Sequence, residues 1–119
     1  MSDNPAPGSV LRDRLRLGTG FDESERSTVI ERLGGLEKRL RSFREDTLEL
    51  ELSIKERDGA DQRLTLECWM AGRPRLVSTS ASTPLDRALI EVRDDMVRQI
   101  TDATSRREPR NSRRLRERP

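Results

Sequence analysis

The chain has 119 residues, of which 24 are Lys or Arg and 22 are Asp or Glu, so its formal net charge is only +2. This length fits one small domain. With no His and a single cysteine, Cys68, the chain cannot form an intramolecular disulfide, a Cys/His zinc site or a Ser-His-Asp triad.

The charge is unevenly distributed along the chain. Residues 21–105 contain 14 basic and 18 acidic side chains, a net charge of −4, whereas residues 106–119 contain seven Arg and two Glu, a net charge of +5. Hydrophobic residues make up 31% of the chain, so any core is small. The apolar runs are too short to span a bilayer and no signal peptide is visible, so we expect a cytoplasmic protein.

The N-terminal part begins with a loose leader over residues 1–9, which is rich in Pro, Gly, Ser and Asn. In the segment Val10–Leu17, the side chains of Leu11, Leu15 and Leu17 fall on one face at period two, and three Arg fall on the other. This pattern predicts a short edge strand whose outward Arg residues discourage pairing with other chains.

A first amphipathic helix of about 20 residues is predicted next. Asp22-x-x-Glu25 has the pattern of an N-cap with a reciprocating Glu three residues later. An apolar stripe at helical spacing follows, formed by Val29, Leu33, Leu36, Leu40 and Phe43. The pair Gly34-Gly35 in the middle indicates either a close approach of the helix to the sheet or a bend, and the sequence does not choose between them.

Three strands and a second helix complete the predicted elements. Residues 47–54 and 63–70 alternate between apolar and polar side chains, and 75–80 is a more polar third strand. Thr83-Pro84 is a typical helix start, and the helix is expected to end near Ser105.

The resulting order is β-α-β-β-β-α. Each helix and the sheet have one apolar face, so we expect a two-layer α+β domain over residues 10–105, with both helices packed on one face of a mostly antiparallel four-stranded sheet. The opposite face is then open to solvent and displays Glu49, Glu51, Glu67 and Trp69.

Basic residues supply the candidate binding site. Those on the two helices could form a joint surface that fits an RNA backbone, diluted by Asp94, Asp95 and Asp102. Residues 106–119 form an Arg-rich tail that cannot fold alone and is expected to be disordered; it is either a phosphate-binding arm or a solubilising tail. The candidate RNA-binding residues are Arg32, Lys38, Arg39, Arg44, Arg87, Arg98, Arg106, Arg107, Arg110, Arg113 and Arg114.

Other candidate functional groups are less promising. The adjacent carboxylates of Asp94 and Asp95 point about 100° apart on a helix, so they do not converge on one metal ion, and no metal or cofactor is expected. Cys68 falls among apolar strand residues and is expected to be an inert core thiol. Trp69 points outward, where it could stack on a base, anchor a partner, or lie across its charged neighbours.

The predicted order also resembles the double-stranded RNA-binding domain, whose Lys-rich start of the second helix is missing here. With the first strand included, the chain is more similar to the ribosome hibernation-promoting factor family, also called ribosome-associated inhibitor A. The matches, spread over about residues 10–105, are Leu33-x-x-Leu36-Glu37, Lys55-Glu56 after a Leu-rich strand, the Gly72 turn, and Arg98-Gln99-Ile100.

The resemblance implies a non-enzymatic translation inhibitor that binds small-subunit rRNA near the decoding centre and blocks the mRNA and tRNA sites sterically. It also implies that Arg32, Arg44 and Arg98 occupy basic positions of the family. The family signature that opens the second helix reads Asp86-Arg87-Ala88-Leu89-Ile90 here, and several family basic positions are acidic or neutral. The Arg-rich tail would then compensate. The alternative is a protein-interaction module on the same fold that has lost ribosome binding.

Overall fold

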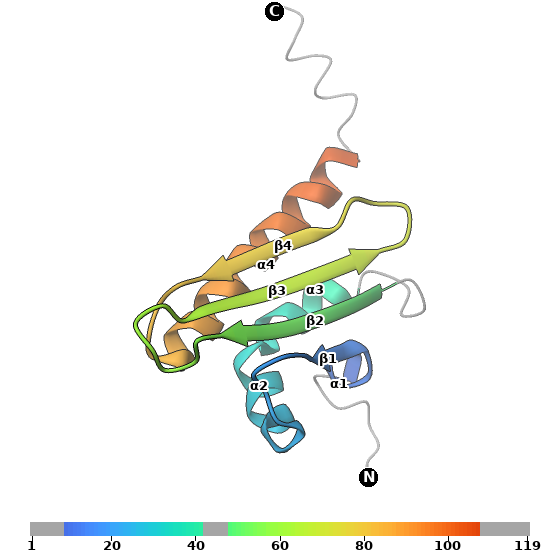
Figure 1. Cartoon of the computed structure of the whole chain (residues 1–119). Coiled ribbons are helices and arrows are strands. Elements are labelled where there is room, and N and C mark those ends of the chain that lie inside the picture. The colour runs from blue at the N-terminus through green and yellow to red at the C-terminus, as the bar shows by residue number, and fades with distance from the viewer. Residues whose placement is uncertain (1–8, 42–47, 108–119) are drawn as a thin grey trace, which may run out of the picture.

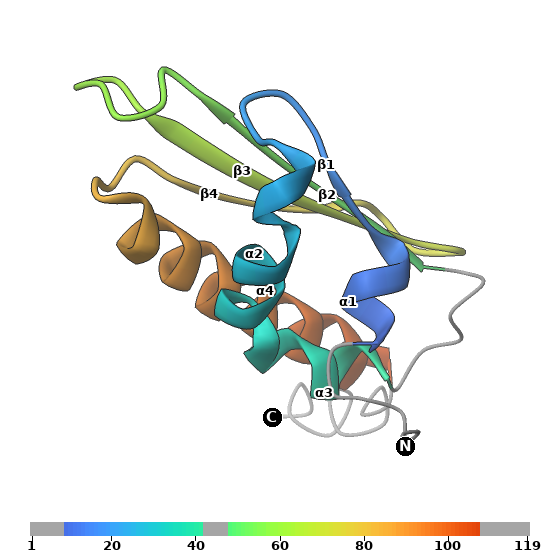
Figure 2. The same cartoon turned by 90° about the horizontal axis from the view of Figure 1, so that it is seen from below.

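The computed structural model describes residues 9–41 and 48–107 of the chain. Helices lie on one side of a four-stranded sheet, and the other side of the sheet is open (Figures 1 and 2). In chain order, the elements are α1 (Ser9–Arg14), β1 (Leu15–Leu17), the 3-10 turn η1 (Glu23–Glu25), α2 (Arg26–Arg32), the 3-10 turn η2 (Gly34–Leu36), α3 (Glu37–Leu40), β2 (Leu48–Lys55), β3 (Arg63–Met70), β4 (Leu76–Ser80) and α4 (Leu85–Arg107).

The sheet has the strand order β1-β2-β3-β4. β1 pairs with β2 in parallel, with Leu15 opposite Leu50, while β2–β3 and β3–β4 are antiparallel hairpin pairs. The predicted α+β class, the β-α-β-β-β-α order and the mostly antiparallel sheet are therefore confirmed. The parallel pairing follows from the helical connection between β1 and β2, which returns the chain to the same end of the sheet.

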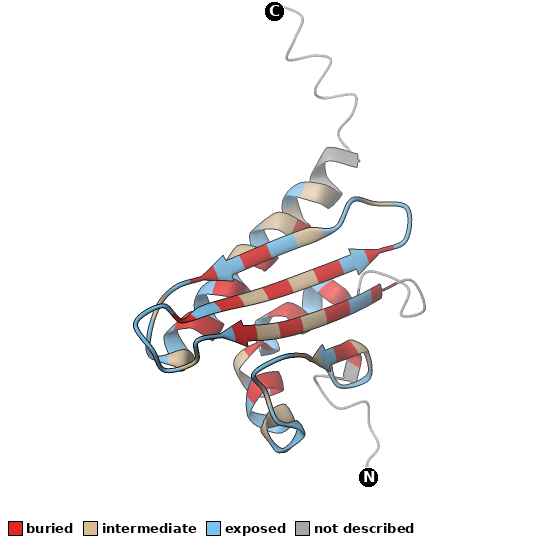
Figure 3. Ribbon diagram, in the orientation of Figure 1, coloured by how far each residue is buried: buried red, intermediate tan, exposed pale blue. Residues whose placement is uncertain are grey.

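Strict alternation of side chains along the strands makes one sheet face apolar, as Figure 3 shows for β2 and β3. Leucines of both strands and Cys68 are buried against the helices, together with Val29, Leu33, Leu36 and Leu40 of the predicted first stripe and apolar residues of α4. The buried apolar core consists of Val10, Leu11, Leu15, Val29, Ile30, Leu33, Leu36, Leu40, Leu48, Leu50, Leu52, Ile54, Leu64, Leu66, Cys68, Met70, Ala88, Leu89, Val92, Met96 and Ile100.

The predicted strand over Val10–Leu17 is wrong for its first half, because residues 9–14 form the short helix α1. Leu11 and Leu15 are four residues apart, so they face the same side both in a strand and in a single helical turn. Both are buried in the core, and their spacing therefore fits either conformation. The carboxylate of Glu37 decides between them by accepting hydrogen bonds from the backbone N–H groups of Val10 and Leu11, which a helix start leaves without intrahelical acceptors.

The predicted first helix is divided into three pieces. Its start is as expected, because Asp22 accepts a hydrogen bond from the Ser24 N–H and the Asp22 N–H donates to Glu25, completing a capping box. The helix breaks at Gly34-Gly35, where η2 redirects the chain into α3. A Cβ at Gly35 would lie 3.2 Å from Cδ of Arg93 in α4, whereas one at Gly34 would have no neighbour within 4 Å. The segment therefore bends here, and the close approach is that of Gly35 to α4 rather than to the sheet.

Several predicted boundaries differ by one or two residues. The third strand starts at Leu76 rather than at residue 75, and α4 continues to Arg107, two residues beyond the predicted end. Ser9, which was expected in the leader, begins α1. The predicted Phe43 contact, Thr47 and the tail from residue 108 lie outside the described residues.

Candidate nucleic-acid interface

The predicted RNA-binding residues are spread over the helical layer. Arg32 ends α2, Lys38 and Arg39 lie on α3, and Arg87 and Arg98 lie on α4. Arg106 and Arg107 are the last two residues of α4. The remaining four candidates lie outside the described residues; they are Arg44, Arg110, Arg113 and Arg114. The described positions therefore lie in the helical layer of the molecule, but their partners within that layer differ.

Arg32 is held by a carboxylate of α4. Its Nε and Nη2 groups donate to the two carboxylate oxygens of Asp86 at 3.3 and 3.4 Å, and the hydrogen bond to Asp86 raises the pKa of Arg32. This bidentate geometry ties the end of α2 to the start of α4. The guanidinium of Arg32 thus fastens two helices together, and a phosphate would have to compete with Asp86 for it.

Arg98 is neutralised in a similar way by Asp95, one turn earlier on α4. Burial alone would raise the pKa of Asp95, but hydrogen bonds from Gln99, Ser78 and Arg98 outweigh it and hold that pKa below its ordinary value. Gln99 also donates to the Val77 carbonyl of β4 at 2.8 Å. Asp95 is therefore a stable anion that links α4 to the sheet edge and occupies the guanidinium of Arg98.

The remaining basic residue in the middle of α4, Arg93, lies across the junction with α2. Its Nη2 group lies 2.8 Å from Oδ1 of Asp94, and its Nη1 group donates to the carbonyl of Arg32 at 3.4 Å. Between Leu85 and Ala103, α4 has three Arg against five carboxylates, a net charge of −2. The Leu85–Ala103 part of α4 is thus net acidic, and Arg93 and Arg98 are ion-paired with two of the aspartates that were expected to dilute the basic surface.

Lys38 and Arg39 differ from these residues because both are exposed and have no ion-pair partner within the described ranges, whereas the exposed Arg87 lies near Glu91 and its charge helps to lower the pKa of that carboxylate. Lys38 and Arg39 occupy consecutive positions on the solvent side of α3, whose other residues, Glu37 and Leu40, are buried. Their charges are consequently available to an external anion, which makes α3 the strongest part of the predicted surface.

The short helix α1 lies beside Lys38 and Arg39 and carries further basic residues that the predicted site did not include. The buried carboxylate of Glu37 accepts the N–H of Val10 at 3.1 Å and that of Leu11 at 3.2 Å, and it also accepts a hydrogen bond from Nε of Arg41 at 3.2 Å. This contact holds α1 against α3, and the two helices lie next to each other in Figure 2. We define the α1–α3 corner by its basic residues, Arg12, Arg14, Lys38, Arg39 and Arg41.

The sequence contained one signal for this corner. In the sequence, Glu37 directly follows Leu36 of the apolar stripe. In the structure its side chain is only 5% exposed, which is unusual for a carboxylate without a structural role. A buried Glu indicates an acceptor for unpaired backbone donors, but its partners come from residues 26 and 27 positions earlier in the chain. No local pattern specifies such a contact.

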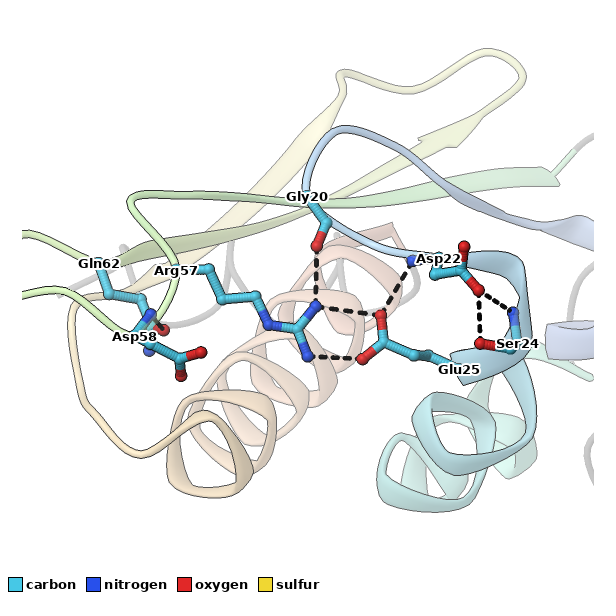
Figure 4. A network of polar contacts seen from close by, with 7 residues as sticks. All are labelled: Gly20, Asp22, Ser24, Glu25, Arg57, Asp58 and Gln62. Atoms are coloured by element: carbon cyan, nitrogen blue, oxygen red, sulfur yellow. Dashed lines mark hydrogen bonds and ion pairs between the residues drawn. The ribbon is translucent and has the colours of Figure 1, made fainter.

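At the opposite end of β2, a second polar network joins two loops (Figure 4). Arg57, in the β2–β3 loop, donates from Nη1 to Glu25 at 3.0 Å and to the Gly20 carbonyl at 2.8 Å, and from Nη2 to Glu25 at 2.5 Å. The hydrogen bonds from Arg57 lower the pKa of Glu25 to about 2. Gly20 has a φ of +88° and packs against Ile54, so the loop needs a glycine there. This network is structural.

The open face of the sheet has a different character. Trp69 and Val77 are each 37% exposed on neighbouring strands. Glu49 is exposed beside them, whereas Glu51 and Glu67 are half-buried rather than fully open as predicted. Arg75 contacts Glu67 at 3.2 Å, and Arg16 lies 3.9 Å from Glu49. Two apolar side chains within a charge-balanced surface form a small contact patch.

Other site chemistries find little support in the described ranges. No group of three or more His, Cys, Asp or Glu side chains there could hold a metal ion. Cys68 is buried, and burial raises the pKa of its thiol to about 12, so the thiolate nucleophile is not accessible. Among the helices of these residues, none combines the length and the apolar character needed to cross a membrane.

Comparisons with known proteins show a likeness to solved structures. No protein-family model matches the sequence, and no curated protein matches it. The fold is similar to the crystal structure of the Thermus thermophilus Protein Y N-terminal domain, with a TM-score of 0.47 and 18% identity, over 72% of this chain and 91% of that domain. Protein Y is a member of the ribosome hibernation family that the sequence resembles. This likeness is one of chain course and assigns no function to any residue.

Proposed function

We propose that this protein is a ribosome-associated translation inhibitor that binds small-subunit rRNA near the decoding centre. It acts without covalent chemistry: the bound domain occupies the mRNA and tRNA sites and excludes both ligands sterically. The proposal follows the family resemblance of the sequence, and it places the protein in the cytoplasm as a reversible factor in the response to stress.

The observation that supports it most is the set of unpaired cations on the helical layer. Lys38 and Arg39 are exposed without a carboxylate partner in the described part of the chain, while the sheet lies on the other side. Exposed cations of this kind release counterions when they neutralise phosphates, which supplies most of the affinity of RNA-backbone binding. Seven Arg in residues 106–119 add charge to the same chain.

Sedimentation with ribosomes tests the proposal directly. The full chain should move with purified small subunits through a sucrose gradient at about 50 mM salt and be released at about 300 mM, because phosphate contacts weaken steeply with salt. A tail variant with Arg110, Arg113 and Arg114 replaced by Gln should be released at lower salt. A chain that stays at the top of the gradient at low salt would contradict the proposed function.

A second candidate function is supported by the exposed pair of Trp69 and Val77. Aromatic side chains are frequent anchors of protein interfaces, and this patch lies on the sheet face that the helices leave open. If the chain is an interaction module, Trp69→Ala should abolish capture of a protein partner, and Lys38→Gln should not. If it binds ribosomes, Trp69→Ala should change subunit affinity less than about twofold, since the tryptophan lies away from the unpaired cations.

A further inference from the structure

The N-terminal helix α1 brings cations to α3 that no part of the predicted site included. We propose that the α1–α3 corner is an RNA-backbone binding site in which Arg12 and Arg14 contact phosphates together with Lys38 and Arg39. The inference rests on the proposed function in one respect, namely that the polyanion is RNA.

The first argument is the geometry of the tether. Glu37 accepts both the Val10 and the Leu11 N–H, so α1 is fixed to the α3 residue that directly precedes Lys38. Val10 and Leu11 are buried in the core, which leaves Arg12 exposed on the next residue of the turn. The backbone positions that carry the cations of the two short helices are therefore held beside each other, which reduces the entropy lost when they bind a ligand.

The second argument is the charge balance. Residues 10–14 and 37–41 hold five basic side chains and two carboxylates, a net charge of +3. Of the two carboxylates, Glu37 is buried and forms an ion pair with Arg41, whereas Asp13 is exposed on α1. The charges of Arg12, Arg14, Lys38 and Arg39 are therefore offset only by Asp13 within these two segments. No comparable density of uncompensated positive charge occurs on α4 between Leu85 and Ala103, where the net charge is −2.

The third argument concerns the partners of the individual arginines. Arg12 and Arg14 have no ion-pair partner within the described ranges, and Nε of Arg14 is shielded from solvent without a hydrogen-bond acceptor there. Guanidinium groups bind phosphate oxygens bidentately and are over-represented where phosphates are recognised. An arginine held by the fold but not by a carboxylate is suited to a phosphate of an RNA chain.

A matched pair of double variants in the full chain tests the corner. Arg12→Gln/Arg14→Gln removes two charges from α1, and Arg16→Gln/Arg63→Gln removes two charges from the open sheet face. Affinity is measured from 50 to 200 mM KCl for a 20-nucleotide oligouridylate and for purified small ribosomal subunits. Thermal melting and the single variant Arg12→Gln, which alters an exposed side chain, show whether any loss comes from misfolding.

The expected result is a loss confined to the corner variant. Its affinity for oligouridylate should fall about tenfold at 100 mM KCl, and its log–log salt slope should decrease by about 1.4, because each phosphate contact to a single strand contributes about 0.7. The sheet-face variant should lose less than about threefold, since its charges act only at a distance. Arg12→Gln alone should decrease the slope by about half as much.

The outcomes separate the two proposals. Equal losses of affinity in both double variants, with either probe, would overturn the proposal that the α1–α3 corner binds RNA. Binding to oligouridylate but not to small subunits would contradict the ribosomal function, and the corner would then be judged on oligouridylate alone. A wild-type chain that binds neither probe would overturn both proposals.

Discussion

The α1–α3 corner and the outer face of α4 are two basic regions of one helical layer, and they differ in what their arginines contact. In the corner, Arg12 and Arg39 are exposed and have no partner among the described residues. On α4, Arg98 is bound by Asp95, and Asp86 binds Arg32 from α2. A count of basic residues therefore overstates the binding capacity of α4, because a paired guanidinium must break one contact to make another.

The largest expected effect comes from removing the tether that forms the corner. Glu37→Gln keeps the shape of the side chain but removes its charge, leaving one of the Val10 and Leu11 N–H groups facing an amide NH2. We expect a loss of about 2 kcal/mol in the free energy of unfolding, as for other buried hydrogen bonds to charged groups. Urea denaturation at pH 7 measures it.

The same variant also distinguishes charge from geometry. Glu37→Gln makes the chain more positive by one unit, so a purely electrostatic surface would bind oligouridylate more tightly. A corner organised by Glu37 should bind it about threefold to tenfold more weakly, because α1 is no longer fixed beside α3. Tighter binding by this variant would contradict the importance of the tether.

The next effect compares paired and unpaired cations at equal change in net charge. Lys38→Gln/Arg39→Gln should weaken oligouridylate binding about tenfold, whereas Arg32→Gln/Arg98→Gln should weaken it less than about threefold. The reason is that Arg32 and Arg98 already donate to Asp86 and Asp95. Fluorescence anisotropy at 100 mM KCl measures both. Equal losses would remove the distinction between the two regions.

A third region, the Arg57–Glu25 network, provides a test of stability separate from binding. The pKa of Glu25 is lowered from 4.5 to about 2, so its contribution is fully present above pH 4.5 and is lost as the pH falls toward 2. Both side chains are 30% exposed. Relative to Glu25→Gln, the wild type should therefore be more stable by about 1 kcal/mol at pH 6. That difference should shrink below pH 4.5 in urea titrations, while oligouridylate affinity at pH 7 stays the same in both.

The smallest effect should appear when α4 is made to resemble the corner. Asp94→Asn/Asp95→Asn releases Arg93 and Arg98 from their carboxylates and changes the net charge of the Leu85–Ala103 segment from −2 to zero. We expect oligouridylate binding to tighten about threefold, mainly through a faster association rate. Stopped-flow mixing at 50 mM KCl resolves that rate. An unchanged rate would indicate that RNA does not approach this face.

Much of the fold followed from local patterns. Alternation in β2 and β3 places Leu50, Leu66 and Cys68 inside and Trp69 outside, because successive strand side chains point to opposite faces. The capping box at Asp22 and the apolar spacing along α4 also depend only on residues that are close together in the sequence. The break of the first helix could be suspected at Gly34-Gly35, but the side chain that packs closely on Gly35, Arg93, is more than 50 residues away in the sequence.

The sequence by itself determined the element order, the buried faces and the supply of arginines, because these depend on residue type and spacing along the chain. Tertiary structure alone decided that residues 9–14 are helical, since their backbone donors are accepted by Glu37. It also decided which arginines are neutralised, because the pairing of Arg32 with Asp86 joins residues 54 positions apart. Charge is a property of the sequence, but the availability of that charge depends on contacts between distant segments.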